Sequence, residues 1–170
     1  LPVAGAWWAD DFPGASYAAR LSQRQELLGV FELTGTALLL RGVVSPEAGL
    51  YRTELTYDPA VRVLAFPIDP DDTWSDTATV SGLAQGVYSI YTEAYQSDVD
   101  ASGDAVTPYG SFPVLRVRVE LTRTVGAAVV TNRTYLFVSE CYGTVATVVS
   151  NDYEPDAEFT QAAELRRLAP

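Results

Sequence analysis

The sequence predicts an all-β protein whose antiparallel strands form a sandwich or a barrel. Residues 113–124 alternate apolar and polar side chains, which is the pattern of a strand with one buried face. Two later runs, 129–138 and 144–150, are rich in the β-branched and aromatic residues that strands favour. Short segments containing Gly, Pro or Asp separate such runs, so we expect tight turns between consecutive strands.

Further strands are expected before residue 113, which makes about eight in all. They are expected at 30–44, 50–57, 61–68, 76–82 and 86–95. Between the second and third of these, Asp58-Pro59 predicts a tight reversal, because proline fixes φ and the aspartate side chain caps the turn.

The N-terminal residues depart from the strand pattern. Residues 1–14 carry the pair Trp7-Trp8 among Gly and Pro, and they predict an extended arm. A length of 170 residues, 48% of them hydrophobic, suits one globular domain, which we place at 15–170.

The C-terminal residues fit two kinds of element. Acidic residues at 154–158 precede an Ala/Leu-rich stretch that ends in Arg166-Arg167, and this order suits a short helix and its dipole. Alternation of Phe159, Gln161, Ala163 and Leu165 suits a strand nearly as well. We favour the helix.

The composition excludes several kinds of catalysis. The chain has no His and no Lys, which removes His-dependent triads, His-bearing zinc sites, lysine Schiff bases and P-loops. A single cysteine, Cys141, excludes an internal disulfide and is expected to be a small buried residue. We therefore expect that the protein is not an enzyme. Glu54, Glu93, Glu120 and Glu140 are candidate carboxylates for a glycoside hydrolase, but their spacing does not pair them.

The net charge makes some classes of binding partner unfavourable. A formal net charge of -11 and a pI near 4.2 disfavour nucleic acid and anionic membranes. The sequence contains no apolar run of the roughly 18 residues that a spanning helix needs. The chain begins with Leu1, which fits either a processed, secreted chain or an excised fragment.

Three segments together resemble the galactose-binding-like jelly-roll modules. They are FELTGTALLLRG at 31–42, GLYRTEL at 49–55 and GLAQGVYSIYTEA at 82–94. The resemblance covers roughly residues 30–95 and implies a jelly-roll-like antiparallel β-sandwich, for which carbohydrate binding is a frequent role. Together with the predictions for the two termini, the expected fold is a jelly-roll-like antiparallel β-sandwich with an extended N-terminal arm and a short C-terminal helix.

One acidic segment copies half of a calcium-binding loop. Asp98, Asp100 and Ser102 place side-chain oxygens at alternate positions, Gly103 permits a sharp bend, and Asp104 follows. These residue types suggest calcium held by Asp98, Asp100, Ser102 and Asp104. Tyr109 stands where the bidentate glutamate of such a loop would be, so a solvated acidic loop is the favoured interpretation and calcium is the alternative.

The aromatic residues suggest recognition rather than catalysis. An exposed arm bearing Trp7, Trp8 and Phe12 would need a surface to dock on, either in its own domain or in a second subunit. Our leading hypothesis is a secreted or cell-surface structural and adhesive module, non-catalytic, that forms a homo-oligomer or polymer through these three residues. The alternative is a carbohydrate-binding module, assisted by calcium at residues 98–104.

Overall fold

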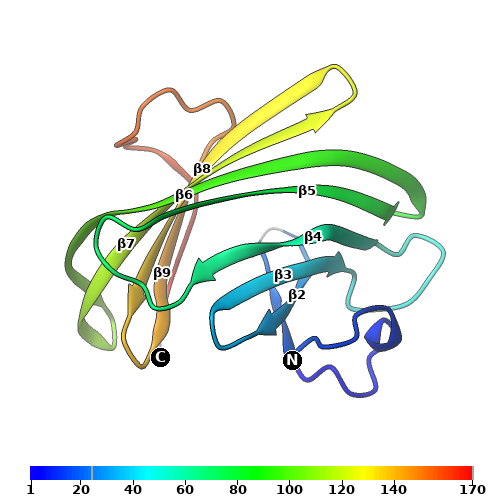
Figure 1. Cartoon of the computed structure of the whole chain (residues 1–170), viewed down its shortest axis with the longest axis horizontal. Helices are drawn as coiled ribbons and strands as arrows, with labels where there is room; N and C mark the ends of the chain where they lie inside the picture. The colour runs from blue at the N-terminus through cyan, green and yellow to red at the C-terminus, as the bar shows by residue number, and fades with distance from the viewer. Residues whose placement is uncertain (24, 170) are drawn as a thin grey trace. The chain divides into compact units, whose positions relative to one another are not determined.

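The computed structural model describes residues 1–23 and 25–169, and it is all-β (Figure 1). One short 3₁₀ helix, η1, spans Ala9–Asp11. Ten strands follow, each hydrogen-bonded to its neighbours in sequence, in a sheet of order β1-β2-β3-β4-β5-β6-β7-β8-β9-β10. Their bounds are β1 Tyr17–Arg20, β2 Leu28–Leu33, β3 Ala37–Val44, β4 Glu54–Ala65, β5 Thr73–Ala84, β6 Val87–Thr107, β7 Gly110–Val125, β8 Ala128–Ser139, β9 Gly143–Ser150 and β10 Ala162–Arg167.

The predicted strand content is confirmed, but the predicted jelly-roll sandwich is wrong. Each strand pairs with the next one along the chain, so the sheet is a single antiparallel meander rather than two sheets. The three segments that resemble a jelly roll lie on consecutive hairpins of this meander, at β2–β3, at the start of β4 and at β5–β6. Alternation shows that a strand has one buried face, but it does not show whether a second sheet covers that face.

Contacts divide the chain into two compact units. Unit 1 comprises Leu1–Pro67, Asp76–Glu93 and Thr124–Ala127, and unit 2 comprises Ile68–Ser75, Ala94–Arg123 and Ala128–Pro170. The division between an arm at 1–14 and a domain at 15–170 stays a prediction. Among residues 1–23 and 25–169, no helix has both the length and the apolar character needed to cross a bilayer.

One cluster of core residues in unit 1 lies between its first three strands and the N-terminal segment. Trp8 and Phe12 pack with Ala18, Leu28, Val30 and Val44, and the two aromatic rings meet edge to face at 6.2 Å. In Figure 1 the N-terminal segment, in dark blue, lies beside β2 and β3. Gly42 in β3 makes room for this packing, since a Cβ there would overlap the Phe12 ring and the carbonyl oxygen of Leu55.

The predicted extended arm is therefore wrong. Residues 1–14 form turns and the 3₁₀ helix η1, and Trp8 and Phe12 are each only 2% exposed. Backbone hydrogen bonds from Ala6 to Val3 and from Ala9 to Ala6 fold the segment back on itself. Burial of two large aromatic rings outweighs the extended conformation that Gly and Pro suggested.

Two expected strand boundaries in unit 1 differ from the structure. The expected strand 30–44 is the hairpin of β2 and β3, whose turn is closed by the Thr34 hydroxyl oxygen accepting the Ala37 N–H at 2.9 Å. The reversal expected at Asp58-Pro59 is instead a bulge inside the continuous strand β4. Gly42 pairs with Thr56 while Leu40 pairs with Val61, so β4 holds extra residues between them, and its other edge stays in register with β5.

Unit 2 contains most of β6 and β7 together with β8, β9 and β10. Three strand predictions, at 113–124, 129–138 and 144–150, agree closely with β7, β8 and β9. The predicted C-terminal helix is wrong, because residues 162–167 form β10, which pairs antiparallel with β9 from Ala162↔Ser150 to Arg167↔Ala146. Hydrogen bonding to an available strand edge outweighs the helix propensity of Ala and Leu, because a segment this short is only marginally stable as a helix.

Candidate functional site

The expected calcium loop is part of a strand. Asp98, Asp100, Ser102 and Asp104 all lie within β6, which runs from Val87 to Thr107. Alternate residues of a strand share a face, but they are about 6.8 Å apart along it. Their oxygens therefore do not converge on one ion at the roughly 2.3–2.6 Å that calcium requires. Within the described residues, no three His, Cys, Asp or Glu side chains form a group that could hold a metal ion.

Two of these aspartates instead form forked ion pairs with arginines of β7. Asp100 accepts hydrogen bonds from Arg116 Nε and Nη2 at 2.8 and 3.1 Å. Asp98 accepts one from Arg118 Nε at 3.1 Å, and Arg118 Nη2 lies 3.1 Å from its other oxygen. Paired donors on a planar guanidinium match the two oxygens of a carboxylate, which makes these contacts stronger than single ion pairs.

Arg116, together with Arg133 and Tyr135 of β8, also holds an irregular segment, residues 151–161, which we call the strap. Arg116 Nη2 donates to Glu158 at 2.7 Å, and Arg133 Nη1 donates to the carbonyl oxygen of Asp156 at 2.6 Å. The Tyr135 hydroxyl donates to the carbonyl oxygen of Ala157 at 2.6 Å. Figure 1 shows the strap as an orange-red loop between β9 and β10.

Three groups around the strap have shifted pKa values. The hydrogen bonds that Arg116 donates to Asp100 and then to Glu158 raise the pKa of Arg116, and the hydrogen bond from Arg116 lowers the pKa of Glu158. Burial raises the pKa of Tyr135, with a further contribution from the negative charge of Glu158. These shifts move each group away from neutrality, so the cluster suits structural ion pairing rather than proton transfer.

The three residues predicted to contact another subunit lie within unit 1. Trp8 and Phe12 belong to its core, and Trp7 is partly buried. The Trp7 indole Nε1–H donates to the carbonyl oxygen of Ser45 at 3.2 Å, and the Arg52 guanidinium lies 5.7 Å from the centre of its ring. The N-terminal segment therefore docks in its own unit, which is one of the two arrangements expected from the sequence.

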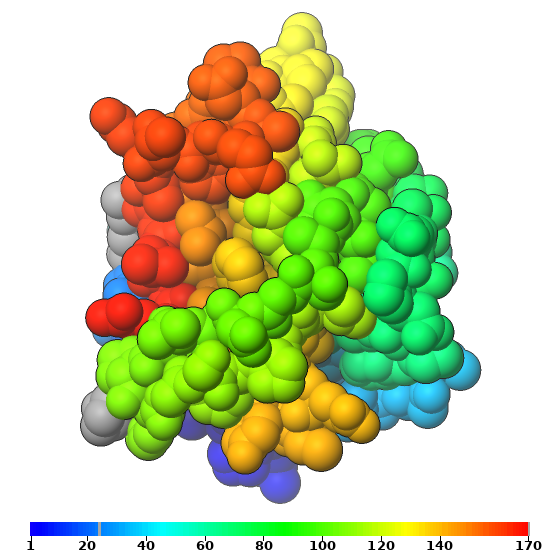
Figure 2. All heavy atoms as spheres, turned by 90° about the vertical axis from the view of Figure 1, so that its left-hand side faces the viewer, coloured from blue at the N-terminus to red at the C-terminus, as the bar shows by residue number. Residues whose placement is uncertain are grey.

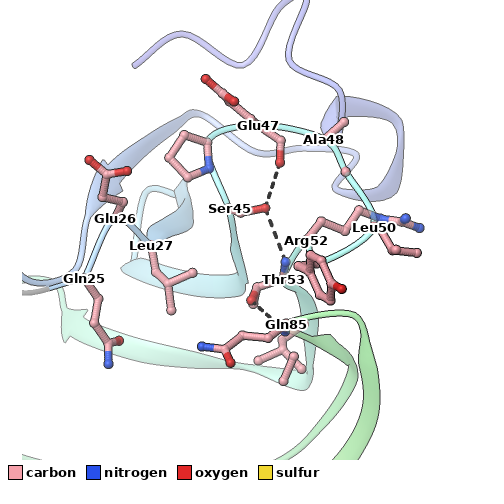
Figure 3. A pocket seen from close by; sticks show the side chains of 15 residues that line it. Gln25, Glu26, Leu27, Ser45, Glu47, Ala48, Leu50, Arg52, Thr53 and Gln85 are labelled. Carbon is pink, nitrogen blue, oxygen red and sulfur yellow. Dashed lines mark hydrogen bonds between the residues drawn. The ribbon is translucent and has the colours of Figure 1, made fainter.

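Unit 1 also carries a pocket of about 760 Å³, drawn in Figure 3. Its walls come from the segment before β2, from the loop between β3 and β4, and from the turn between β5 and β6. The Ser45 hydroxyl donates to the Glu47 carbonyl oxygen at 2.9 Å and accepts the Thr53 N–H at 3.2 Å. The Thr53 hydroxyl accepts the Gln85 N–H at 3.2 Å, which ties the loop to the turn (Figure 3).

Beside this pocket, unit 1 exposes five large hydrophobic side chains, which we call the rim patch. Leu50 and Tyr51 lie in the β3–β4 loop, and Val87, Tyr88 and Ile90 begin β6; each is between 60% and 81% exposed. The Gly86 N–H donates to the carbonyl oxygen of Arg52 at 2.9 Å, which holds the two segments together. Gly86 has a φ of +80° and contacts the Leu50 backbone so closely that a Cβ would overlap it.

Unit 2 has a second exposed apolar group, which we call the tip cluster. It comprises Val106, Tyr109 and Tyr142, which are between 62% and 77% exposed. Tyr142 meets the Phe112 ring edge to face at 5.0 Å, and Figure 2 shows the β6–β7 tip in lime against the β8–β9 turn in orange. Cys141, expected to be buried, is exposed in that turn at a φ of 69°.

The sequence did not predict the rim patch, because it places Leu50 and Tyr51 in a strand at 50–57, whereas β4 begins at Glu54. Val87, Tyr88 and Ile90 do begin a strand, and the pattern gave no sign that they are exposed. The position of Leu50 and Tyr51 directly after Gly49 was the available signal, since residues beside a turn glycine often lie outside the paired part of a strand. Of the carboxylates weighed for hydrolysis, Glu54 pairs with Arg52 at 2.9 Å and Glu120 with Arg133 at 3.0 Å.

Comparisons of the chain with protein-family models, with curated proteins and with solved structures find no match. The resemblance to galactose-binding-like modules stays a prediction, and any function must be argued from the residues themselves.

Proposed function

We propose that the protein is a non-catalytic adhesive module, secreted or at the cell surface, that associates with copies of itself through the rim patch. The observation that carries the proposal is the exposure of Leu50, Tyr51, Val87, Tyr88 and Ile90, each more than half exposed, on two segments of unit 1 that the Gly86–Arg52 backbone hydrogen bond joins. Large apolar side chains exposed on adjoining segments favour an interaction site.

The energetics favour contact through this surface. Burying a large apolar side chain contributes about 1.5–3 kcal/mol, so two copies of the patch supply several such contributions against the cost of association. Tyr51 and Tyr88 also present rigid rings with hydroxyl groups, which are enriched at protein interfaces.

The charges on and around the rim patch favour a second copy of the chain as its binding partner. The five patch residues are uncharged, so the contact itself carries none of the net charge of -11. Arg52 and Glu47 lie on the same loop beside the patch, and a two-fold contact can bring each against the opposite charge of the second copy. We expect the remaining repulsion to weaken with salt, because the Debye length falls from about 30 Å at 0.01 M to about 3 Å at 1 M.

The test is the state of association in sedimentation velocity at low and high salt. We expect the wild type to self-associate, more strongly at high salt, and the variant L50S/Y51S/V87S/Y88S to lose that contact. The control is Tyr109→Ser with Tyr142→Ser in the tip cluster, which removes comparably exposed rings and should leave association unchanged. A monomeric wild type at both salt concentrations, or unchanged assembly of the patch variant, would contradict the proposal.

A carbohydrate ligand is the second candidate, and the pocket is the observation that favours it. Its volume of about 760 Å³ lies within the range of small-molecule sites. Gln25, Gln85 and Glu47 line it and offer amide and carboxylate groups to sugar hydroxyls, while Tyr51 offers a ring for stacking.

A glycan array followed by calorimetry tests this candidate, with calcium and with a chelator. Binding that Tyr51→Ala abolishes and Tyr109→Ala leaves intact would support it. If no glycan binds under either condition, the carbohydrate candidate fails, and the adhesive proposal is unaffected.

A further inference from the structure

The two ends of the sheet differ in what occupies their outer edges. At the β1 end, Leu1 lies against the outer edge of the strand, where its ammonium donates to the Ala18 carbonyl oxygen at 2.7 Å and its carbonyl oxygen accepts the Ala18 N–H at 3.0 Å. At the other end, β10 has β9 as its neighbour, and the strand order gives it no second neighbour among residues 1–23 and 25–169. An open edge of this kind is a template for another strand.

The hydrogen bonds of β10 show which backbone groups face outward. Leu168 N–H donates to the Val145 carbonyl oxygen at 2.9 Å, on the β9 side. Because backbone groups alternate along a strand, the groups of Arg166 and Glu164 also face β9, whereas those of Leu165 and Arg167 face away from it. The side chain of Leu165 is 57% exposed.

We propose that two copies of the chain join through their β10 edges as antiparallel strands, with Leu165 opposite Leu165 at the two-fold axis. In this register the outward N–H and C=O groups of Leu165 pair with those of the second copy. Glu164 of each copy then lies opposite Arg166 of the other. The segment Glu-Leu-Arg is self-complementary in charge when it is read antiparallel, so the contact places opposite charges together at both ends.

The Glu164 and Arg166 side chains are already arranged for such pairing. Within one chain, Arg166 Nε lies 3.0 Å from Glu164 Oε1, on the same face of β10. A second copy extends this pair to a group of four alternating charges across the two-fold axis. Opposite charges directly across two strands stabilise the pairing, and like charges there destabilise it.

The edge contact adds to the proposed function. The contact itself does not depend on the rim-patch proposal, and only the polymer that combines the two contacts rests on it. The β10 contact alone gives a closed dimer, because a two-fold contact uses the same strand edge in both copies. Combined with a rim-patch contact, two different two-fold interfaces alternate along an unbranched polymer. The edge contact therefore predicts the form of assembly that the adhesive proposal leaves open.

Charge exchange at β10 tests the contact in the rim-patch variant L50S/Y51S/V87S/Y88S, where only the edge remains. That variant should sediment as a dimer. Adding Glu164→Arg, or adding Arg166→Glu, places like charges opposite each other, and each protein alone should become monomeric. An equimolar mixture of the two should dimerise again, because every Arg then meets a Glu, with affinity at least about tenfold above either protein alone. Monomers throughout, or dimers throughout, would overturn the inference.

A disulfide test does not depend on the charges. In a Cys141→Ser background, Leu165→Cys should oxidise to a covalent dimer, because directly opposite hydrogen-bonded residues have Cα atoms about 5.5 Å apart, within disulfide range. Arg167→Cys is the control, since in the proposed register it lies opposite Ala163 and far from its own copy. Equal crosslinking of both variants, or of neither, overturns the register.

The two proposals fail separately. Leu165→Pro removes an outward N–H and spares the hydrogen bonds to β9, so loss of the dimer in this variant tests the β10 edge contact and not the rim patch. Assembly that is unchanged by the rim-patch substitutions contradicts the adhesive proposal and leaves the edge contact standing.

Discussion

Two irregular segments cover strands of this protein, and they are held by opposite kinds of interaction. The N-terminal segment of unit 1 is held by the buried rings of Trp8 and Phe12. The strap of unit 2 is held by arginine, carboxylate and hydroxyl contacts with Arg116, Arg133 and Tyr135. Apolar contacts respond to side-chain volume, whereas ion pairs respond to pH and salt, so the two segments should fail under different conditions.

The largest expected effect is that of Trp8→Ala in the N-terminal segment. Removing this 2%-exposed indole leaves a cavity among Phe12, Ala18 and Val30, and we expect a loss of about 3–5 kcal/mol in the free energy of unfolding. Urea denaturation followed by far-UV circular dichroism measures it. A loss below about 1 kcal/mol would show that the ring is not part of the core.

Gly42→Ala tests the same packing from the strand side. The added methyl group overlaps the Phe12 ring and the Leu55 carbonyl oxygen, so we expect a loss of about 1–3 kcal/mol. The matched control is Gly35→Ala, where a Cβ meets nothing within 4 Å and the backbone needs no glycine. Equal unfolding free energies for the two variants would contradict this explanation of the role of Gly42.

Arg116→Ala should release the strap rather than the N-terminal segment. The substitution removes the donors to Asp100 and Glu158 and the cation over the Tyr135 ring, whose centre lies 4.6 Å from the guanidinium carbon. We expect a loss of about 1–2 kcal/mol, reduced by solvent screening. Hydrogen exchange should accelerate in residues 151–161 and stay unchanged in residues 1–14. Uniform acceleration would contradict the comparison.

Lowering the pH should have the smallest effect on stability, and it should loosen the strap before it affects the N-terminal segment. The pKa of Glu158 is lowered from its usual 4.5 by the hydrogen bond from Arg116, so its contribution is present above pH 4.5 and is lost as the pH falls through the lowered value. Hydrogen exchange at pH 3, corrected for intrinsic rates, should rise in the strap before it rises in the N-terminal segment. Glu158→Gln removes the charge that Arg116 binds. Its strap should therefore exchange faster already at neutral pH and should respond little further to acid.

The sequence predicted strands where alternation was strong and failed where pairing decided the structure. The run at 113–124 could be assigned because Val117 and its alternate neighbours demand one buried face. Whether that face belongs to a sandwich or to a meander depends on which strands pair, and alternation does not encode pairing. Residues 162–167 show the same limit, since the edge of β9 decides that they form a strand.

The candidate sites were harder to predict for a related reason. Asp98 and Asp100 have the spacing of calcium ligands, and the same spacing also places two carboxylates on one face of a strand. Their partners, Arg116 and Arg118, come from the next strand and could not be found by local spacing. The rim patch likewise exists only because the β5–β6 turn meets the loop before β4.

The distribution of arginine along the chain has a practical consequence for proteolysis. With no lysine in the chain, trypsin can cut only after arginine, and no arginine lies between Arg133 and Arg166. The strap therefore offers trypsin no site even when it opens. A glutamate-specific protease has Glu154 and Glu158 there, and Glu158 is the strap carboxylate that Arg116 binds. The rate of cleavage after Glu158 should therefore rise with the fraction of molecules in which the strap is open.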